Sequence, residues 1–229
     1  MREQRLVIDK IDFEPKHIFE CGQCFRWHKK EEDCYIGVFG NNVLMVKKEG
    51  NHMVFEGMCG GDIKEVVWNY FDIETNYSQM KTQLSKVDSY LKTSIEFGYG
   101  IRILNQDLWE MVISFIISAN NNIPRIQKII ERISKEYGTP ITWKDETYYT
   151  FPTKEQLAKA SIEDLRNLGL GFRDKYIYET TKKFLQGEVT LEELKSIQDV
   201  KEIKHKLEAL PRYRTKSSRL YFVIWYAPF

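Results

Sequence analysis

The sequence lacks the features that mark membrane-spanning and secreted proteins. No uninterrupted apolar run in its 229 residues approaches the length of a membrane span. The amino terminus has no charged stretch followed by an apolar run, so no secretory signal is predicted. Cysteines are few and are confined to the first quarter of the chain, at Cys21, Cys24, Cys34 and Cys59. Without a secretory signal, we expect them to be reduced thiols in the cytosol.

The sequence also lacks a convincing metal or redox site. Cys21 and Cys24 form a Cys-x-x-Cys pair, but a zinc site needs a second ligand pair at suitable spacing, and the four histidines form none. A redox-active Cys-x-x-Cys pair usually lies where a strand leads into a helix. Here the pattern of Phe25, Arg26 and Trp27 predicts that the strand continues. We interpret the segment as two strand cysteines separated by a glycine, and we predict no metal and no cofactor.

Charge of one sign is absent as well. The chain has 34 Lys and Arg against 33 Asp and Glu, which gives a net charge of +1. The net charge therefore does not favour a nucleic-acid partner, although it does not exclude a local basic patch.

The spacing of the apolar residues changes along the chain. Up to about residue 57 the apolar runs are short and strand-like, and Gly40-Asn41 and Gly50-Asn51 are typical of hairpin turns. Beyond Gly61 the spacing of apolar residues becomes helical. The pattern predicts an α+β protein, in which an antiparallel sheet region precedes a helical domain.

The helical half carries recognisable start signals. Asp62 is placed to cap a first helix, and Asp107 begins a clearer one with Glu110 three residues on. Three asparagines, 120–122, interrupt the pattern, and a second helix then runs to Gly138. Thr153 with Gln156 predicts a capping box, and further helices are expected up to about residue 186 and over 199–209.

Two segments allow both a structural and a functional interpretation. The asparagine triplet followed by Arg125 can be a pair of helix caps, or a helix amino terminus that binds a phosphate. Phe172 and Arg173 follow a glycine turn, and can be an ordinary helix start with a solvated face. They can also be a wedge that fills a gap in a base stack, beside a guanidinium that contacts an exposed base edge.

Taken together, five segments resemble the 8-oxoguanine DNA glycosylases of the helix-hairpin-helix superfamily. They are CGQCFRW (21–27), VDSYL (87–91), ISFIISANNNIPRI (113–126), FP (151–152) and LGLGFRDKY (168–176). Their order and spacing fit over nearly all of residues 1–211. The resemblance implies an N-terminal domain of the 8-oxoguanine glycosylase type over 1–104 and a helical glycosylase domain, incomplete at its end, over 105–211.

The resemblance also implies roles for single residues. Gly22 corresponds to the strand glycine whose carbonyl detects the proton on N7 of the oxidised base, a bond worth about 1–3 kcal/mol when it is lost in a buried site. Asn120 corresponds to the residue that occupies the space left by the flipped base. Arg125 and Arg173 correspond to the pair that contacts the unpaired cytosine, and Phe172 corresponds to the wedge. A base inside a duplex must be extruded before an active site can reach it, so the vacancy must be filled.

The activity that the resemblance implies is base-excision repair. Such an enzyme removes 8-oxoguanine by lysine attack on the sugar C1′ and then cleaves the strand by β-elimination. The implied partner is double-stranded DNA with oxidised guanine opposite cytosine. The implied protein is a bacterial, cytoplasmic, nucleoid-associated monomer that needs no cofactor.

The resemblance stops at Pro211, where the family has a hairpin of the form PGxGxKVADC that carries the nucleophilic lysine. Residues 212–229 contain no glycine and no Val-Ala-Asp. Degenerate codons for this tail, read one base later, can encode Gly-Ile-Gly-Gln-Lys-Val-Ala-Asp-Cys-Ile. We interpret 212–229 as an out-of-frame tail, with the family lysine encoded near Lys216. No catalytic residue is therefore assigned.

Two other readings stay open at this point. The chain as printed can be a catalytically dead remnant that still binds damaged DNA, because the nucleophile and a later aspartate are missing. It can also be a helical scaffold for protein partners. Activity on an 8-oxoguanine duplex separates the first reading from an enzyme, and DNA binding at low salt separates the second from both.

Overall fold

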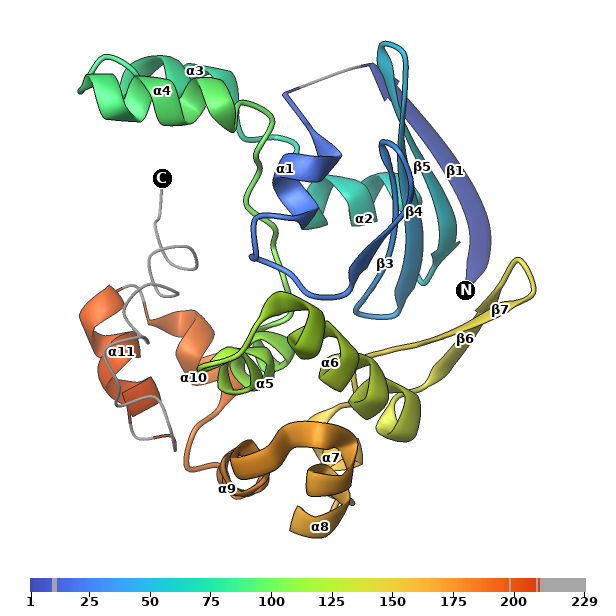
Figure 1. Cartoon of the computed structure of the whole chain (residues 1–229), viewed down its shortest axis with the longest axis vertical. Helices are drawn as coiled ribbons and strands as arrows, with labels where there is room; N and C mark the ends of the chain where they lie inside the picture. Colours follow the sequence, from blue (N-terminus) through green and yellow to red (C-terminus); the bar gives the residue numbers. More distant parts are fainter. Residues whose placement is uncertain (10–11, 198, 209, 211–229) are drawn as a thin grey trace. The chain divides into compact units, whose positions relative to one another are not determined.

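The computed structural model describes residues 1–9, 12–197, 199–208 and 210. The chain forms two compact units (Figure 1). The first contains residues 1–106 together with 141–148, and the second contains 107–140 and the described residues from 149 onward. An α+β fold is confirmed, with the antiparallel sheet in the first unit and helices predominating in the second.

The first unit is built on a five-stranded antiparallel sheet with the strand order β1-β5-β4-β3-β2. The strands are β1 (Arg2–Asp9), β2 (Trp27–Glu31), β3 (Cys34–Phe39), β4 (Asn42–Glu49) and β5 (His52–Cys59). Pairing of Phe39 with Asn42 leaves a two-residue turn that begins at Gly40, with φ +50°. Pairing of Glu49 with His52 leaves a second one that begins at Gly50, with φ +57°. Both hairpins predicted from the glycine-asparagine signals are confirmed.

Both faces of the sheet carry apolar side chains. Phe13, Tyr35 and Phe55 belong to a core cluster that includes residues of the short helix α1 (Pro15–Phe19) and of α2 (Ile63–Tyr70), and Figure 1 shows these helices beside the sheet. Alternate residues of β3 and β4 join a second cluster with Ile141 and Trp143. Burial on both faces explains why every residue of β3 is buried.

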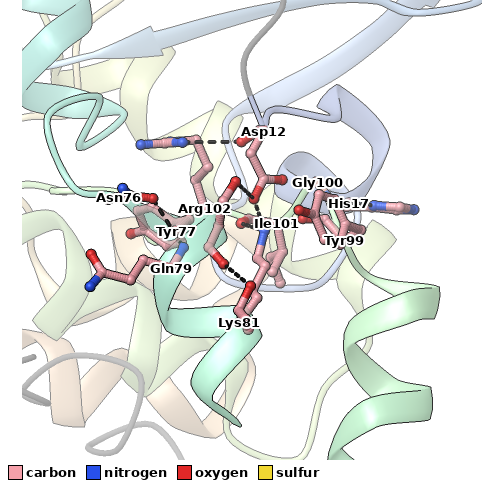
Figure 2. Close-up of polar contacts among 12 residues, drawn as sticks. Asp12, His17, Asn76, Tyr77, Gln79, Lys81, Tyr99, Gly100, Ile101 and Arg102 are labelled. Atoms are coloured by element: carbon pink, nitrogen blue, oxygen red, sulfur yellow. Dashed lines mark hydrogen bonds and ion pairs between the residues drawn. The ribbon is translucent and has the colours of Figure 1, made fainter. Parts of the chain in front are cut away.

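A buried cation links the segments that flank the helices α3 (Tyr77–Leu84) and α4 (Ser89–Phe97). Arg102 is 2% exposed, and its guanidinium donates to the main-chain carbonyls of Phe71, Asp12, Asp72 and Thr75. Nearby, Lys81 of α3 forms an ion pair with Asp12 at 2.7 Å (Figure 2). Burial lowers the pKa of Arg102. Arg102 therefore ties together segments that are far apart in the sequence.

The second unit consists mainly of helices, and most of them begin at a side-chain cap. They are α5 (Leu108–Ser118), α6 (Ile123–Tyr137), α7 (Lys154–Leu157), α8 (Ile162–Leu165), α9 (Asp174–Leu185), α10 (Leu191–Ser196) and α11 (Val200–Glu208). Asp107 accepts the Glu110 amide, and Thr153 with Gln156 forms the predicted capping box. Between α8 and α9 the chain makes a π turn, 166–170, and a 3-10 turn, 171–173. No helix in the described part of the chain combines the length and the apolar character that a membrane span requires.

Two expectations about local structure are wrong. The predicted strand through Cys21–Arg26 is a loop between α1 and β2, because Gly22 adopts φ +86°, which an extended strand does not allow. The hairpin of β6 (Pro140–Trp143) and β7 (Glu146–Tyr149) was not expected, and most of it packs with the first unit. The tail 212–229, with Lys216, lies outside the described residues.

Candidate nucleic-acid interface

Gly22 lies at the turn of the loop that follows α1. Its φ of +86° is a conformation that residues with a Cβ rarely adopt, so the position favours glycine for a backbone reason. The residue is half-buried. A main-chain carbonyl can therefore be presented here without a side chain beside it.

The neighbouring Gln23 fixes this loop. Its side chain is buried, and Nε2 donates to the carbonyls of Ile18 at 3.0 Å and of Arg102 at 2.9 Å. Its Oε1 accepts the amide of Leu104 at 3.1 Å, and its main-chain carbonyl accepts Nε2 of Gln106 at 2.7 Å. Four bonds at one residue hold the Gly22 turn in place. Our sequence analysis missed Gln23 and Gln106 because their partners lie about 80 residues away.

The aromatic end of the same motif anchors the loop to the sheet. Trp27 stacks on Phe19 with ring centroids 4.1 Å apart, and its indole Nε1 donates to the Tyr70 hydroxyl at 3.0 Å. A Cβ at Gly37, across the strand pair, would lie 2.3 Å from the Trp27 ring. The absence of a side chain at Gly37 therefore leaves room for the Trp27 indole.

The cysteines are all free thiols. Cys21 is exposed, whereas Cys24, Cys34 and Cys59 are buried. Burial raises the pKa values of Cys34 and Cys59 and so disfavours their reactive thiolate forms. In the described ranges no three His, Cys, Asp or Glu side chains gather where they could hold a metal ion.

In the second unit the three asparagines have three different surroundings. Asn122 caps α6 by accepting the Arg125 amide at 3.1 Å. Asn121 donates from Nδ2 to the Ile117 carbonyl at 3.0 Å and so holds the end of α5. Asn120 is exposed and adopts φ +53°, in the left-handed region that Asn tolerates better than most residues. Capping explains Asn122, and leaves the exposed Asn120 side chain available for another role.

Arg125 lies in the first turn of α6. It is exposed, and the helix has Pro124 in the same turn. The first turn of a helix carries unpaired amides and a partial positive charge, so an exposed guanidinium there adds to a site that suits anions.

Phe172 and Arg173 follow two glycines with positive φ, Gly169 at +96° and Gly171 at +57°. Phe172 is one of the exposed large apolar side chains, with an exposed fraction of 52%. Arg173, the next residue, is 2% exposed, and its guanidinium carbon lies 4.4 Å from the centre of the Phe172 ring. The turn thus presents the aromatic ring and buries the cation.

The buried guanidinium of Arg173 contacts the asparagine turn. It donates to the Ala119 carbonyl from Nε at 3.2 Å and from Nη2 at 2.7 Å. Nη2 also donates to the Asn120 carbonyl at 2.9 Å, and Nη1 lies 3.4 Å from the Leu170 carbonyl. The structure therefore joins the two sequence motifs, which are about 50 residues apart. Gly22 belongs to the other unit.

The sequence matches two family models that follow one another along the chain. Residues 5–112 match the N-terminal domain of 8-oxoguanine DNA glycosylase. Residues 113–221 match the HhH-GPD superfamily of base excision DNA repair proteins.

Relatives and solved structures agree with these matches. The N-glycosylase/DNA lyase of Saccharomyces cerevisiae is 31% identical over 198 residues, which cover 79% of this chain and 52% of the yeast protein. The Arabidopsis thaliana N-glycosylase/DNA lyase OGG1 is 30% identical over 168 residues, covering 71% of this chain and 46% of that protein. This chain spans about half the length of these curated relatives.

The structural similarity is also close. The 8-oxoguanine glycosylase/lyase of Clostridium acetobutylicum, solved with double-stranded DNA containing cytosine opposite 8-oxoG, superposes with a TM-score of 0.89 and 37% identity. The match covers 98% of this chain and 77% of that one.

Proposed function

Because the chain belongs to the 8-oxoguanine DNA glycosylase family, we propose that it acts in base-excision repair by binding duplex DNA at an 8-oxoguanine that lies opposite cytosine. The relatives are N-glycosylase/DNA lyases. In the intact protein we assign removal of the base, followed by β-elimination at the abasic sugar. We also propose that it works as a monomer at the chromosome, in the cytoplasm.

The observation that carries the proposal is the joint presentation of Asn120 and Phe172. Both side chains are exposed, and the buried Arg173 contacts both residues. It donates hydrogen bonds to the backbone at Asn120 and stacks on the Phe172 ring. An amide and an aromatic ring on one rigid support are what a vacancy in a base stack requires, since the ring stacks and the amide hydrogen-bonds. Arg125 and Arg173 are the cations that we assign to this DNA-binding surface.

Gly22 is the residue that we assign to lesion recognition. The N7 of 8-oxoguanine carries a proton, and the N7 of guanine does not. A main-chain carbonyl fixed by the Gln23 contacts can accept a hydrogen bond from the oxidised base alone. Fixation matters because a movable carbonyl could turn away from guanine at little cost.

The chemical step needs an amine that attacks C1′, so that the base leaves and a Schiff base forms. We place that lysine in the hairpin which our frame interpretation locates near Lys216, outside the described residues. A second candidate function follows from the same interpretation. The 229-residue chain is then a binding remnant, with the lesion-side and partner-strand residues but without the nucleophile.

Binding by fluorescence anisotropy tests the proposal. We expect the 229-residue chain to bind an 8-oxoguanine:cytosine duplex more tightly than the matched guanine:cytosine duplex, with affinity falling as salt rises. The variant Asn120→Gly keeps the left-handed turn and removes the side chain, so it should lower the affinity for the lesion duplex more than for the undamaged one. Absence of DNA binding at low salt would instead favour a helical scaffold for protein partners.

A further inference from the structure

We propose that an open pocket in the first unit, built around Asp12, binds a small planar molecule that carries an amidine, guanidine or amide group. The pocket has a volume of about 640 Å³, and its lining includes Asp12, Glu14, His17, Ser78 and Tyr99. None of the residues that we assign to DNA recognition lines it. The proposal is therefore independent of the proposed function.

The Asp12 carboxylate has one oxygen in use and one without a partner. Its Oδ2 accepts Lys81 Nζ at 2.7 Å, and Ser78 Oγ lies 3.5 Å from the same oxygen. Its Oδ1 has no hydrogen-bond partner among the residues that the structure describes, although the side chain is only 7% exposed. Figure 2 shows the carboxylate beside Gly100 and His17, which also line the pocket. Because a carboxylate oxygen only accepts, Oδ1 favours a ligand that brings N–H groups.

The two neighbouring cations have their donors engaged elsewhere. Lys81 directs its ammonium at Asp12 Oδ2 and at the carbonyls of Tyr99 and Ile101, and an ammonium has three N–H groups to give. The Arg102 guanidinium is directed at four main-chain carbonyls, one of which is that of Asp12. A donor for Asp12 Oδ1 therefore has to come from outside these two side chains.

Backbone contacts at Gly100 fix one wall of the pocket. The Gly100 carbonyl accepts the Glu14 amide at 2.9 Å, and the Gly100 amide donates to His17 Nδ1 at 3.3 Å. A Cβ at Gly100 would clash with Glu14, so the two segments approach as closely as a glycine allows. A ligand thus meets a preformed wall, and little of its affinity is lost to ordering the protein.

Tyr99 supplies the flat surface that a planar ligand requires. It is 48% exposed, and Lys81 Nζ lies 4.7 Å from the centre of its ring. Planar nitrogen groups stack on such rings, and the amidinium and guanidinium groups also match carboxylates with paired N–H donors. The volume falls in the range of about 300–1,000 Å³ that is usual for small-molecule sites. The ring and the unpartnered Asp12 oxygen together select a planar N–H donor.

Two probes of the same shape test the proposal. Benzamidinium offers only N–H donors to the pocket, and benzoate offers only acceptors. Saturation-transfer NMR titrations with the 229-residue chain should show binding of benzamidinium. Benzoate should bind at least about tenfold more weakly, the size of one lost hydrogen bond to a charged group. Equal binding of the two probes, or no binding of benzamidinium, would overturn the proposal.

The variant Asp12→Asn reverses the pattern of donors and acceptors at this position. The new amide oxygen should face Lys81, which places the amide NH₂ where Oδ1 was. We expect benzamidinium to bind about tenfold more weakly than to the parent, and benzoate to bind more tightly. The control Asp9→Asn removes the same charge from an exposed position outside the pocket lining, and should change neither affinity. Undiminished benzamidinium binding in Asp12→Asn, or an equal loss in Asp9→Asn, would refute a site at Asp12.

A second variant decides the matter should Asp12→Asn not fold. Tyr99→Leu keeps the carboxylate and removes only a half-exposed ring, so benzamidinium should bind at least about threefold more weakly. Tyr90→Leu is the matched control, because Tyr90 is exposed and does not line the pocket, and it should leave the affinity unchanged. Equal affinities of the parent and Tyr99→Leu would show that benzamidinium does not occupy this pocket.

Discussion

At the scale of single residues, Gln23 shows how a buried amide side chain can hold the geometry of a loop. Its carboxamide donates to two main-chain carbonyls and accepts from one main-chain amide. A glutamine is suited to this because one side chain supplies both donors and an acceptor. The Gly22 turn is held by this residue rather than by strand pairing.

Replacing Gln23 by leucine should therefore destabilise the protein more than a typical substitution does. Three buried main-chain groups would lose partners, and we expect the free energy of unfolding to fall by about 2–3 kcal/mol in urea denaturation. Gln79→Leu is the matched control, because Gln79 is exposed on α3, and it should change stability by less than about 0.5 kcal/mol. Equal effects of the two changes would contradict the anchoring role.

Phe172 represents the opposite case, a large side chain that we expect to contribute little to stability. Since it is 52% exposed, Phe172→Ala should leave the melting temperature nearly unchanged while weakening binding to lesion DNA. Phe184→Ala is the control, because Phe184 is 2% exposed against Trp109 and its truncation should cost about 3–5 kcal/mol. A comparable stability loss for Phe172→Ala would show that it is a core residue.

At the scale of elements, the sequence predicted those segments whose signals are local. The hairpin glycines, the Asp107 cap and the Thr153 capping box each act within four residues, and each was recognisable in the sequence. The Gly22 loop was mistaken for a strand because its partners, Arg102 and Leu104, are remote in sequence. The β6-β7 hairpin was missed because it is stabilised by packing on a sheet face formed by residues 36–45, which are remote in sequence.

The tertiary contacts of α3 give a pH dependence. Burial raises the pKa of Tyr77 from its ordinary 10.0 to about 12, and the hydrogen bond to Asp72 acts in the same direction. The folded protein thus holds this proton more tightly than the unfolded chain. The stability contribution is complete below pH 10 and is lost as the pH rises towards about 12.

Urea unfolding between pH 9 and pH 11.5 checks this. We expect the free energy of unfolding to fall with rising pH, and to fall less steeply in Tyr77→Phe, which has no proton to lose. Tyr90→Phe should keep the parent slope, because Tyr90 is 86% exposed on α4. A parent slope retained by Tyr77→Phe would assign the alkaline loss to other groups.

At the scale of the whole molecule, the residues that we propose for DNA recognition are divided between two units. The Gly22 loop belongs to the sheet unit, and Asn120, Arg125, Phe172 and Arg173 belong to the helical unit. The sequence could assign these five residues only through the family resemblance, because no local pattern relates Gly22 to the others. It could not distinguish the two arginines, since exposure of Arg125 and burial of Arg173 arise from tertiary packing.

The last prediction concerns residues 212–229 and rests on the sequence alone. If this tail is out of frame, residues 221–226 form an uncharged apolar run of the type that aggregates when exposed. We expect the printed chain to be less soluble than a chain with the restored frame, and to have no glycosylase activity. Deleting one base at the Pro211/Arg212 junction, with the natural downstream sequence, should give a soluble glycosylase.

Borohydride should trap that protein on 8-oxoguanine DNA, because reduction fixes the lysine Schiff base. Lys216→Ala in the printed chain is the control and should change nothing. Trapping of the printed chain as efficiently as the restored one would place the nucleophile elsewhere and refute the frame interpretation.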